Sequence, residues 1–154
     1  MNNNLPSWLQ KHINIFNNEQ IHHAFIISGS KGIGKNLLIE SLAEKILNNK
    51  ISLENNPDFH NLKILDEKKL IGIDQIHGLR DKLYESSFLG KNKVAVINEI
   101  EKISIDGLNA ILKILEEPPK NTYFLLSTNF LNQIPLTIQS RCLDLRISSP
   151  DIEQ

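Results

Sequence analysis

Cysteine is almost absent from this sequence, since Cys142 is the only one among 154 residues. A single cysteine excludes a disulfide framework or a cysteine-rich zinc site built within the chain. Neither sign of charge is in excess, because 17 basic and 18 acidic residues give a formal net charge of −1. This balance argues against broad, nonspecific adhesion to nucleic acid or to membranes.

Long apolar runs are also absent. No stretch approaches the roughly 20 residues that a membrane-spanning helix needs. The start of the chain, MNNNLPSWLQKH, lacks the basic end and the apolar stretch of a signal peptide. We therefore expect a cytoplasmic protein. A length of 154 residues, with 40% hydrophobic and 23% charged residues, is typical of one globular domain.

Strand and helix patterns alternate along the chain. Short apolar runs predict strands at 22–28, 62–65, 93–99, 122–129 and 143–147. Apolar residues at helical spacing, Leu37 and Ile73 among them, predict helices at 5–16, 34–49, 72–87 and 104–117, and a short one from Pro135. This alternation predicts an α/β fold with a parallel sheet covered on both faces. Ligands of such folds bind at the carboxyl ends of the strands.

The segment GSKGIGKN, residues 29–36, matches a phosphate-binding loop at all but its last position. It lies between a predicted strand and a predicted helix, as that motif requires. The glycines let backbone amides turn toward an anion, the helix start adds its positive end, and the lysine reaches the outer phosphates. The predicted nucleotide-binding residues are Gly29, Gly32, Gly34, Lys35 and Asn36. The alternative is a strand-to-helix turn that binds nothing.

Two positions depart from a magnesium-dependent site. Asn36 stands where a Ser or Thr hydroxyl holds the metal, and Asn98 stands where an Asp does. Glu99 is retained at a position where a glutamate orients the attacking water. Phosphoryl transfer relies on charge neutralisation by the metal, so we do not expect efficient hydrolysis. We predict weak binding of ATP or ADP, little help from magnesium, and no metal site among the histidines.

The segments GLNAILKILEEPPKNTYFLLSTN and IQSRC are more specific than the loop. They resemble the AAA+ subunits of the bacterial clamp loader, the assembly that opens the sliding clamp around primed DNA. Within that family, WLQKH, NPDFHNL and IGIDQIHGLRDKL are most similar to the delta-prime subunits of DNA polymerase III. The resemblance extends from Trp8 to Ile147. It implies an AAA+ P-loop fold, with a five-stranded parallel sheet and helices on both faces.

The resemblance also implies roles for single residues. Lys35 falls in the Walker A motif, Glu99 in a degenerate Walker B motif, and Thr128 or Asn129 at the position called sensor 1. Arg141, in the Ser-Arg-Cys motif, corresponds to an arginine finger that acts on a neighbour's ATP. The implied partners are gamma- or tau-type ATPase subunits and the delta subunit. Contact with the sliding clamp and primer-template DNA is expected to be indirect, and no membrane partner is expected.

Two features depart from the family pattern. Many relatives carry a four-cysteine zinc module after the P-loop helix, whereas the matching stretch, NNKISLENNPDFH, has no cysteine, so no zinc is expected. The family also continues into a helical lid and a collar domain. We assign 1–148 to the AAA+ domain, with its N-terminal helix, and 149–154 to a tail or the start of a lid. Whether the chain is a short form or part of a longer protein stays open.

Three functions remain open at this point. The first is a noncatalytic clamp-loader subunit that offers Arg141 to a neighbour. The second is an ATPase with atypical magnesium ligands, and the third is an interaction module whose pocket and finger are both idle. Asn36 and Asn98 favour the first over the second. Cys142 is expected to be a buried apolar side chain rather than a nucleophile.

Overall fold

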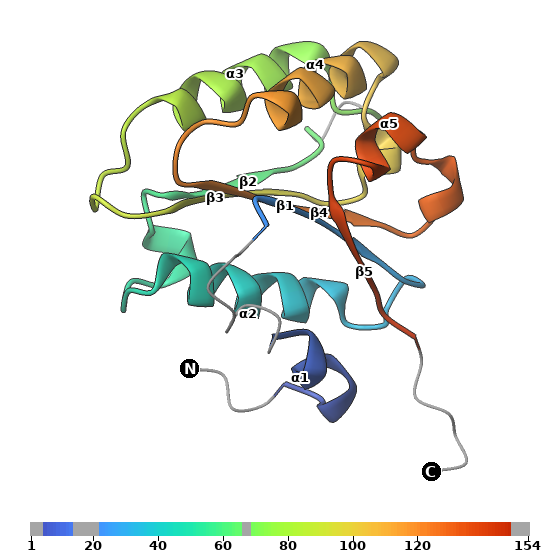
Figure 1. Ribbon diagram of the computed structural model, residues 1–154, viewed down its shortest axis with the longest axis horizontal. Coiled ribbons are helices and arrows are strands. Elements are labelled where there is room, and N and C mark those ends of the chain that lie inside the picture. Colours follow the sequence, from blue (N-terminus) through green and yellow to red (C-terminus); the bar gives the residue numbers. More distant parts are fainter. Residues whose placement is uncertain (1–4, 14–21, 66–68, 149–154) are drawn as a thin grey trace.

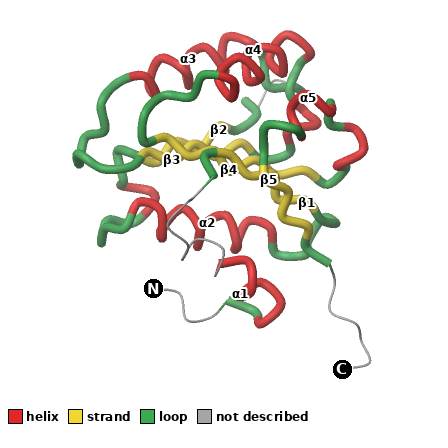
Figure 2. The backbone as a smooth tube through the Cα atoms, in the orientation of Figure 1, coloured by secondary structure: helices red, strands yellow, loops and turns green. Residues whose placement is uncertain are grey.

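A parallel sheet lies between two layers of helices in the computed structural model, which describes residues 5–13, 22–65 and 69–148 (Figures 1 and 2). The sheet has five strands in the order β2-β3-β4-β1-β5, and every neighbouring pair is parallel. The strands are β1 (Ala24–Ser28), β2 (Phe59–Leu62), β3 (Lys93–Ile97), β4 (Thr122–Thr128) and β5 (Leu143–Arg146). The predicted fold class is therefore confirmed.

Helices cover both faces of the sheet (Figure 1). They are α1 (Ser7–Ile13) and α2 (Lys35–Leu47) on one side, and α3 (Ile73–Tyr84), α4 (Ile105–Glu116) and α5 (Leu136–Gln139) on the other. Every residue of β1 and β3 is buried, so side chains on both faces of these strands must be covered. Two apolar cores result, one between the sheet and α3–α4 and one between the sheet and α2.

The predicted helices are confirmed, with differences at their ends and in the burial of two residues. The first was expected to continue to residue 16, but 14–16 lie outside the described residues, as does the predicted tail 149–154. Two residues expected in apolar faces are exposed, Leu37 by 48% and Ile73 by 36%. Each lies in the first turn of its helix, where the chain enters from the loop at the edge of the sheet.

The second strand lies three residues earlier than predicted, at Phe59–Leu62 instead of 62–65. It is an edge strand that pairs only with β3, and its side chains are only partly buried, so it does not need a continuous apolar run. Its start is held by the buried Asp58, whose carboxylate accepts hydrogen bonds from the backbone N–H groups of Phe88 at 2.7 Å and Leu89 at 3.0 Å. These contacts come from distant sequence, which the local pattern does not reveal.

His12, on α1, makes the stability of the fold depend on pH. Only 9% of this residue is exposed, and among the described residues its Nε2 atom has no hydrogen-bond partner. Burial, and secondly the nearby Lys11, lowers the pKa of His12 below its ordinary 6.5. The unfolded chain therefore takes up this proton at a higher pH than the folded chain does. The free energy of unfolding is then largest above about pH 6.5 and falls as the pH falls below that value.

We expect His12→Leu to flatten this dependence, because it removes a group that binds a proton more readily in the unfolded state. Urea unfolding at several pH values between about 7.5 and 5 measures the slope. His23 and His60, whose pKa values are also lowered chiefly by burial, keep part of the slope in the variant. An equal slope in the variant and the unmodified chain would contradict the assignment.

Candidate functional site

The glycine loop connects the end of β1 to the start of α2. Gly32 and Gly34 have φ values of 86° and 107°, in the left-handed region that glycine adopts without strain. Space is restricted as well, since a Cβ atom at Gly34 would lie 3.0 Å from the Leu9 side chain and one at Gly29 would lie 3.0 Å from the Ile147 carbonyl oxygen. Helix α1 and the end of β5 therefore pack directly against the loop.

Lys35, the lysine of the loop motif, is buried at the first position of α2. Its Nζ atom donates hydrogen bonds to the carbonyl oxygens of Gly29 at 2.8 Å and Ser30 at 2.9 Å. Burial lowers the pKa of Lys35, while the negative charges of Glu101 and Glu99 oppose this effect. The ammonium group thus closes the loop on itself, at the point where phosphate oxygens would otherwise receive its hydrogen bonds.

Ser127, near the end of β4, connects the two residues that follow β3. Its hydroxyl donates to Asn98 Oδ1 at 3.2 Å and accepts from the backbone N–H of Glu99 at 3.1 Å. Glu99 has a φ of 54°, which is uncommon for a residue other than glycine and is found more often at functional sites. Sequence reasoning had not singled out Ser127, which reads as an ordinary strand residue.

The Glu99 carboxylate is paired on both oxygens. Lys102 Nζ lies 2.9 Å from Oε2, and Asn129 Nδ2 donates to Oε1 at 3.4 Å. The hydrogen bond from Lys102 is the main reason that the pKa of Glu99 lies below its ordinary value, with a smaller opposing effect from burial. Glu99 is therefore ionised at neutral pH, and each of its carboxylate oxygens already has a partner.

Glu101 is a site residue that the sequence reasoning missed. Its carboxylate accepts hydrogen bonds from the Thr128 hydroxyl at 2.7 Å and from the Asn129 backbone N–H at 3.3 Å. Thr128 is fully buried, so this pair fixes the end of β4 from within. Its place in the sequence could have indicated it. Glu101 follows the end of β3 by only a few residues, at the sheet edge where polar side chains gather.

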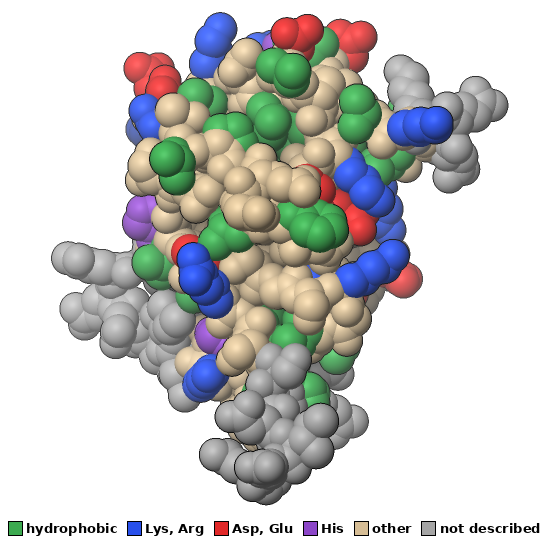
Figure 3. All heavy atoms as spheres, turned by 90° about the vertical axis from the view of Figure 1, so that its right-hand side faces the viewer, with side chains coloured by type: hydrophobic (Ala, Val, Ile, Leu, Met, Phe, Trp, Pro, Cys, Tyr) green, Lys and Arg blue, Asp and Glu red, His purple; other side chains and the backbone are tan. Residues whose placement is uncertain are grey.

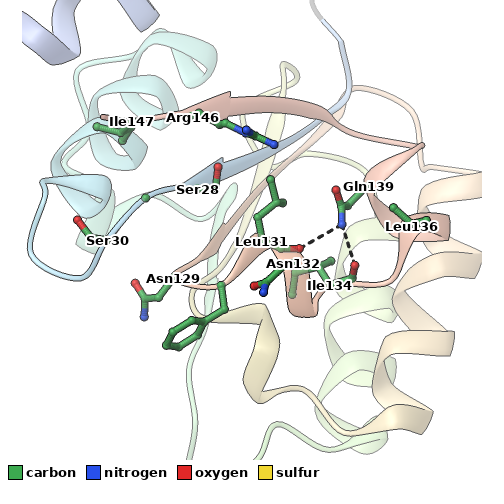
Figure 4. A pocket seen from close by; sticks show the side chains of 12 residues that line it. Ser28, Ser30, Asn129, Leu131, Asn132, Ile134, Leu136, Gln139, Arg146 and Ile147 are labelled. Carbon is green, nitrogen blue, oxygen red and sulfur yellow. Dashed lines mark hydrogen bonds between the residues drawn. The ribbon is translucent and has the colours of Figure 1, made fainter. Parts of the chain in front are cut away.

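Two cavities flank the glycine loop. One, of about 780 Å³, has Ser30 of the loop and Asn129 on its walls, together with the segment that leads into α5 (Figure 4). Gln139 supports that segment by donating to the carbonyl oxygens of Leu131 and Ile134. The other cavity, of about 470 Å³, is lined by Asn36 and Asn98. Of the predicted loop residues, Gly29 therefore shares the first cavity with the sensor residue Asn129, whereas Asn36 lines the second.

Arg141 lines neither of these cavities. It follows α5, where Nη2 lies 2.8 Å from Glu116 Oε1 and Nη1 donates to the Thr137 carbonyl oxygen at 2.8 Å. Its side chain is 35% exposed. The face that carries α5 and β5 mixes basic, acidic and hydrophobic side chains (Figure 3). Among the described residues, the polar contacts of Arg141 are thus with α4 and α5 and not with the phosphate loop.

Other predicted features can be placed as well. Cys142 is half-buried against the core under α3 and α4, and burial raises the pKa of its thiol to about 12, so it is protonated at neutral pH. Within residues 5–13, 22–65 and 69–148, no three His, Cys, Asp or Glu side chains gather as a metal site would require. Of the helices described, none has the length and apolar character needed to cross a bilayer.

Comparison with known proteins places the chain in a family. The family model described as DNA polymerase III, delta subunit, matches residues 5–151. The chain is 33% identical over 148 residues to the tau subunit of DNA polymerase III from Escherichia coli K12, covering 88% of this chain and 23% of the relative. It is 32% identical over 146 residues to the delta-prime subunit from Haemophilus influenzae, covering 86% of this chain and 44% of the relative.

Solved structures agree with the fold. A gamma-subunit-related protein from Thermotoga maritima superposes with a TM-score of 0.77 at 24% identity, covering 94% of this chain and 47% of that one. The RuvB branch-migration motor of the same organism gives 0.63 at 14% identity, covering 91% and 44%. The chain spans less than half the length of these curated relatives. It belongs to the DNA polymerase III delta, delta-prime and gamma/tau family of AAA+ clamp-loader domains.

Proposed function

We propose that this chain is the AAA+ module of a delta-prime-like clamp-loader subunit of DNA polymerase III. In this role it binds ATP or ADP weakly, hydrolyses little of it, and offers Arg141 to ATP held by a neighbouring subunit. The proposed partners are gamma- or tau-type ATPase subunits and the delta subunit, with the sliding clamp and primer-template DNA contacted through the assembly. The observation that carries the proposal is the partly exposed position of Arg141, which lines neither of the cavities beside the loop.

The state of the chain's own site supports a noncatalytic role. Glu99, which would orient an attacking water, is held by Lys102 and Asn129. The Thr128 hydroxyl is used by Glu101. Asn36 and Asn98 are neutral where a magnesium site needs a hydroxyl and a carboxylate. Hydrolysis would therefore require several of these groups to exchange partners and a metal to be held without its usual ligands.

The surroundings of Arg141 suit action on a neighbour. A planar guanidinium can span two phosphate oxygens, whereas a lysine presents one point charge. The side chain of its present partner, Glu116, is 44% exposed, and exposed ion pairs of this kind contribute only about 0–1 kcal/mol. A phosphate from a neighbouring subunit can therefore replace Glu116 at little energetic cost, while the hydrogen bond to Thr137 keeps the side chain in place.

Arg141→Ala should reduce DNA- and clamp-stimulated ATP hydrolysis by the partner ATPase subunits. We expect a drop of about tenfold or more, because arginine fingers in well-studied GTPases contribute about 10³- to 10⁵-fold. Arg141→Lys should restore only part of the rate, since lysine keeps the positive charge but lacks the planar guanidinium that can bind two phosphate oxygens at once. The measurement is steady-state hydrolysis by a reconstituted clamp loader that contains the complete subunit in which this chain occurs.

A matched control is Arg80→Ala, which removes another exposed arginine that is paired with an acid, Asp81, on α3. It should leave the rate unchanged. Assembly of each variant is checked by size-exclusion chromatography. This distinguishes a loss of the arginine's effect on hydrolysis from a failure of the subunit to join the complex. Normal assembly together with an unmodified rate in Arg141→Ala would refute the finger assignment.

The chain alone should hydrolyse ATP at close to the background rate. The double substitution Asn36→Thr with Asn98→Asp should raise turnover, because it returns a hydroxyl and a carboxylate to the metal-binding positions. Adding Lys35→Ala to that pair should abolish the gain, since the lysine would then be missing from the phosphate site. Phosphate release, measured with excess magnesium for the unmodified chain, the double variant and the triple variant, tests these expectations. Robust turnover by the unmodified chain would instead support the ATPase with atypical ligands.

A further inference from the structure

The guanidinium of Arg141 is held from two sides. Nη1 donates to the Thr137 carbonyl oxygen at 2.8 Å and to the Ser140 hydroxyl at 3.3 Å, in and directly after α5. Nη2 lies 2.8 Å from Oε1 of Glu116, the last residue of α4. Among the polar contacts of this side chain found in the described residues, only the one with Glu116 reaches beyond the segment 137–141. Glu116 therefore ties the arginine side chain to the body of the domain.

The last turn of α4 is fixed on both sides of Glu116. The ring of His23, which precedes β1, donates through Nε2 to the Leu115 carbonyl oxygen at 3.3 Å. The hydroxyl of Tyr84, the last residue of α3, donates to the Glu117 carbonyl oxygen at 3.0 Å. The backbone that carries Glu116 is thus tied to the sheet and to a second helix. It stays in place when the arginine side chain turns outward to another subunit.

A phosphate and the Glu116 carboxylate require the same N–H donors. Both are anions whose oxygens accept charge-assisted hydrogen bonds from a guanidinium. They repel each other when both lie beside one arginine. Because the backbone of Glu116 is fixed, the carboxylate does not accompany Arg141 into an interface. It competes with the phosphate instead of helping the arginine to bind it.

We infer that Glu116 is a built-in competitor of the proposed arginine finger. It occupies Arg141 until a phosphate of the neighbour's ATP displaces it, and it thereby raises the ATP concentration that the neighbouring subunit needs. The inference rests on the proposed role of Arg141. The arginine has to leave Glu116 before it meets either bound ATP or the transition state, so both are disfavoured equally. The competitor therefore raises KM and leaves kcat unchanged.

The test is DNA- and clamp-stimulated hydrolysis over a range of ATP concentrations, by a reconstituted clamp loader that contains the complete subunit in which this chain occurs. Glu116→Gln keeps the length of the side chain and an acceptor oxygen but removes the charge. It should lower KM for ATP by about two- to fivefold, the range that an exposed ion pair allows, with kcat unchanged.

Glu117→Gln is the matched control. It removes the same charge one residue further along, from a side chain that lines the cavity between α3 and α4 and has no contact with Arg141 among the described residues. The backbone carbonyl that Tyr84 contacts is retained in this variant. Both kinetic parameters should therefore stay as in the unmodified complex, and size-exclusion chromatography checks that each variant assembles.

A double-mutant cycle shows whether Glu116 acts through Arg141. In an Arg141→Ala background, Glu116→Gln should have no effect on KM, because the competitor then has nothing to occupy. A decrease of KM of the same size in both backgrounds would mean that the carboxylate acts on ATP or on the neighbour by another route. That result overturns the inference.

The outcomes separate this inference from the proposed function. If Arg141→Ala slows hydrolysis but Glu116→Gln leaves KM unchanged, the finger assignment stands and the competitor role is wrong. A lower kcat in Glu116→Gln also overturns the inference, because it would identify Glu116 as a residue that positions the arginine for catalysis. If neither variant changes hydrolysis in a complex that assembles normally, both the inference and the finger assignment are overturned.

Discussion

Burial of the central strands on both faces is the constraint on which the rest of the structure depends. Every residue of β1 and β3, and nearly all of β4, is excluded from water. Their backbone groups must therefore pair with neighbouring strands, and their side chains require helices above and below the sheet. Polar side chains have room only where the strands end. The carboxyl edge consequently gathers the glycine loop, Asn98, Glu99 and Thr128 in one place.

The polar groups at this edge satisfy one another. Ser127 joins Asn98 to the turn after β3, Glu101 holds Thr128, and Lys102 neutralises Glu99. Partly buried charges and hydrogen-bonding groups require partners, and these pairs provide them without a ligand. The same pairing limits chemistry, because a bound phosphate has to compete with internal contacts at Lys35, and the Glu99 and Glu101 carboxylates already have partners.

Arg141 is held by other contacts than the polar groups at this edge. Its contacts are with α4 and α5, and the cavities beside the loop do not include it. The proposed finger role is compatible with a degenerate site in the same chain, since none of the hydrogen bonds found for Arg141 in the described residues involves the phosphate loop. The Ser-Arg-Cys motif and the altered magnesium positions are therefore compatible within one domain.

The sequence by itself determined the features that depend on neighbouring residues. The run from His22 to Lys35 predicts a buried strand, a glycine turn and a helix, because apolar periodicity and glycine conformation act over a few residues. The resemblance of the motifs also pointed to the family, and to Arg141 as the residue that corresponds to an arginine finger. Only the tertiary structure decided the register of β2, the pairing of Glu101 with Thr128, and the hydrogen bond from Ser127 to Asn98. Each of these rests on hydrogen bonds between segments about 30 residues apart, which form only once the sheet brings the strand ends together.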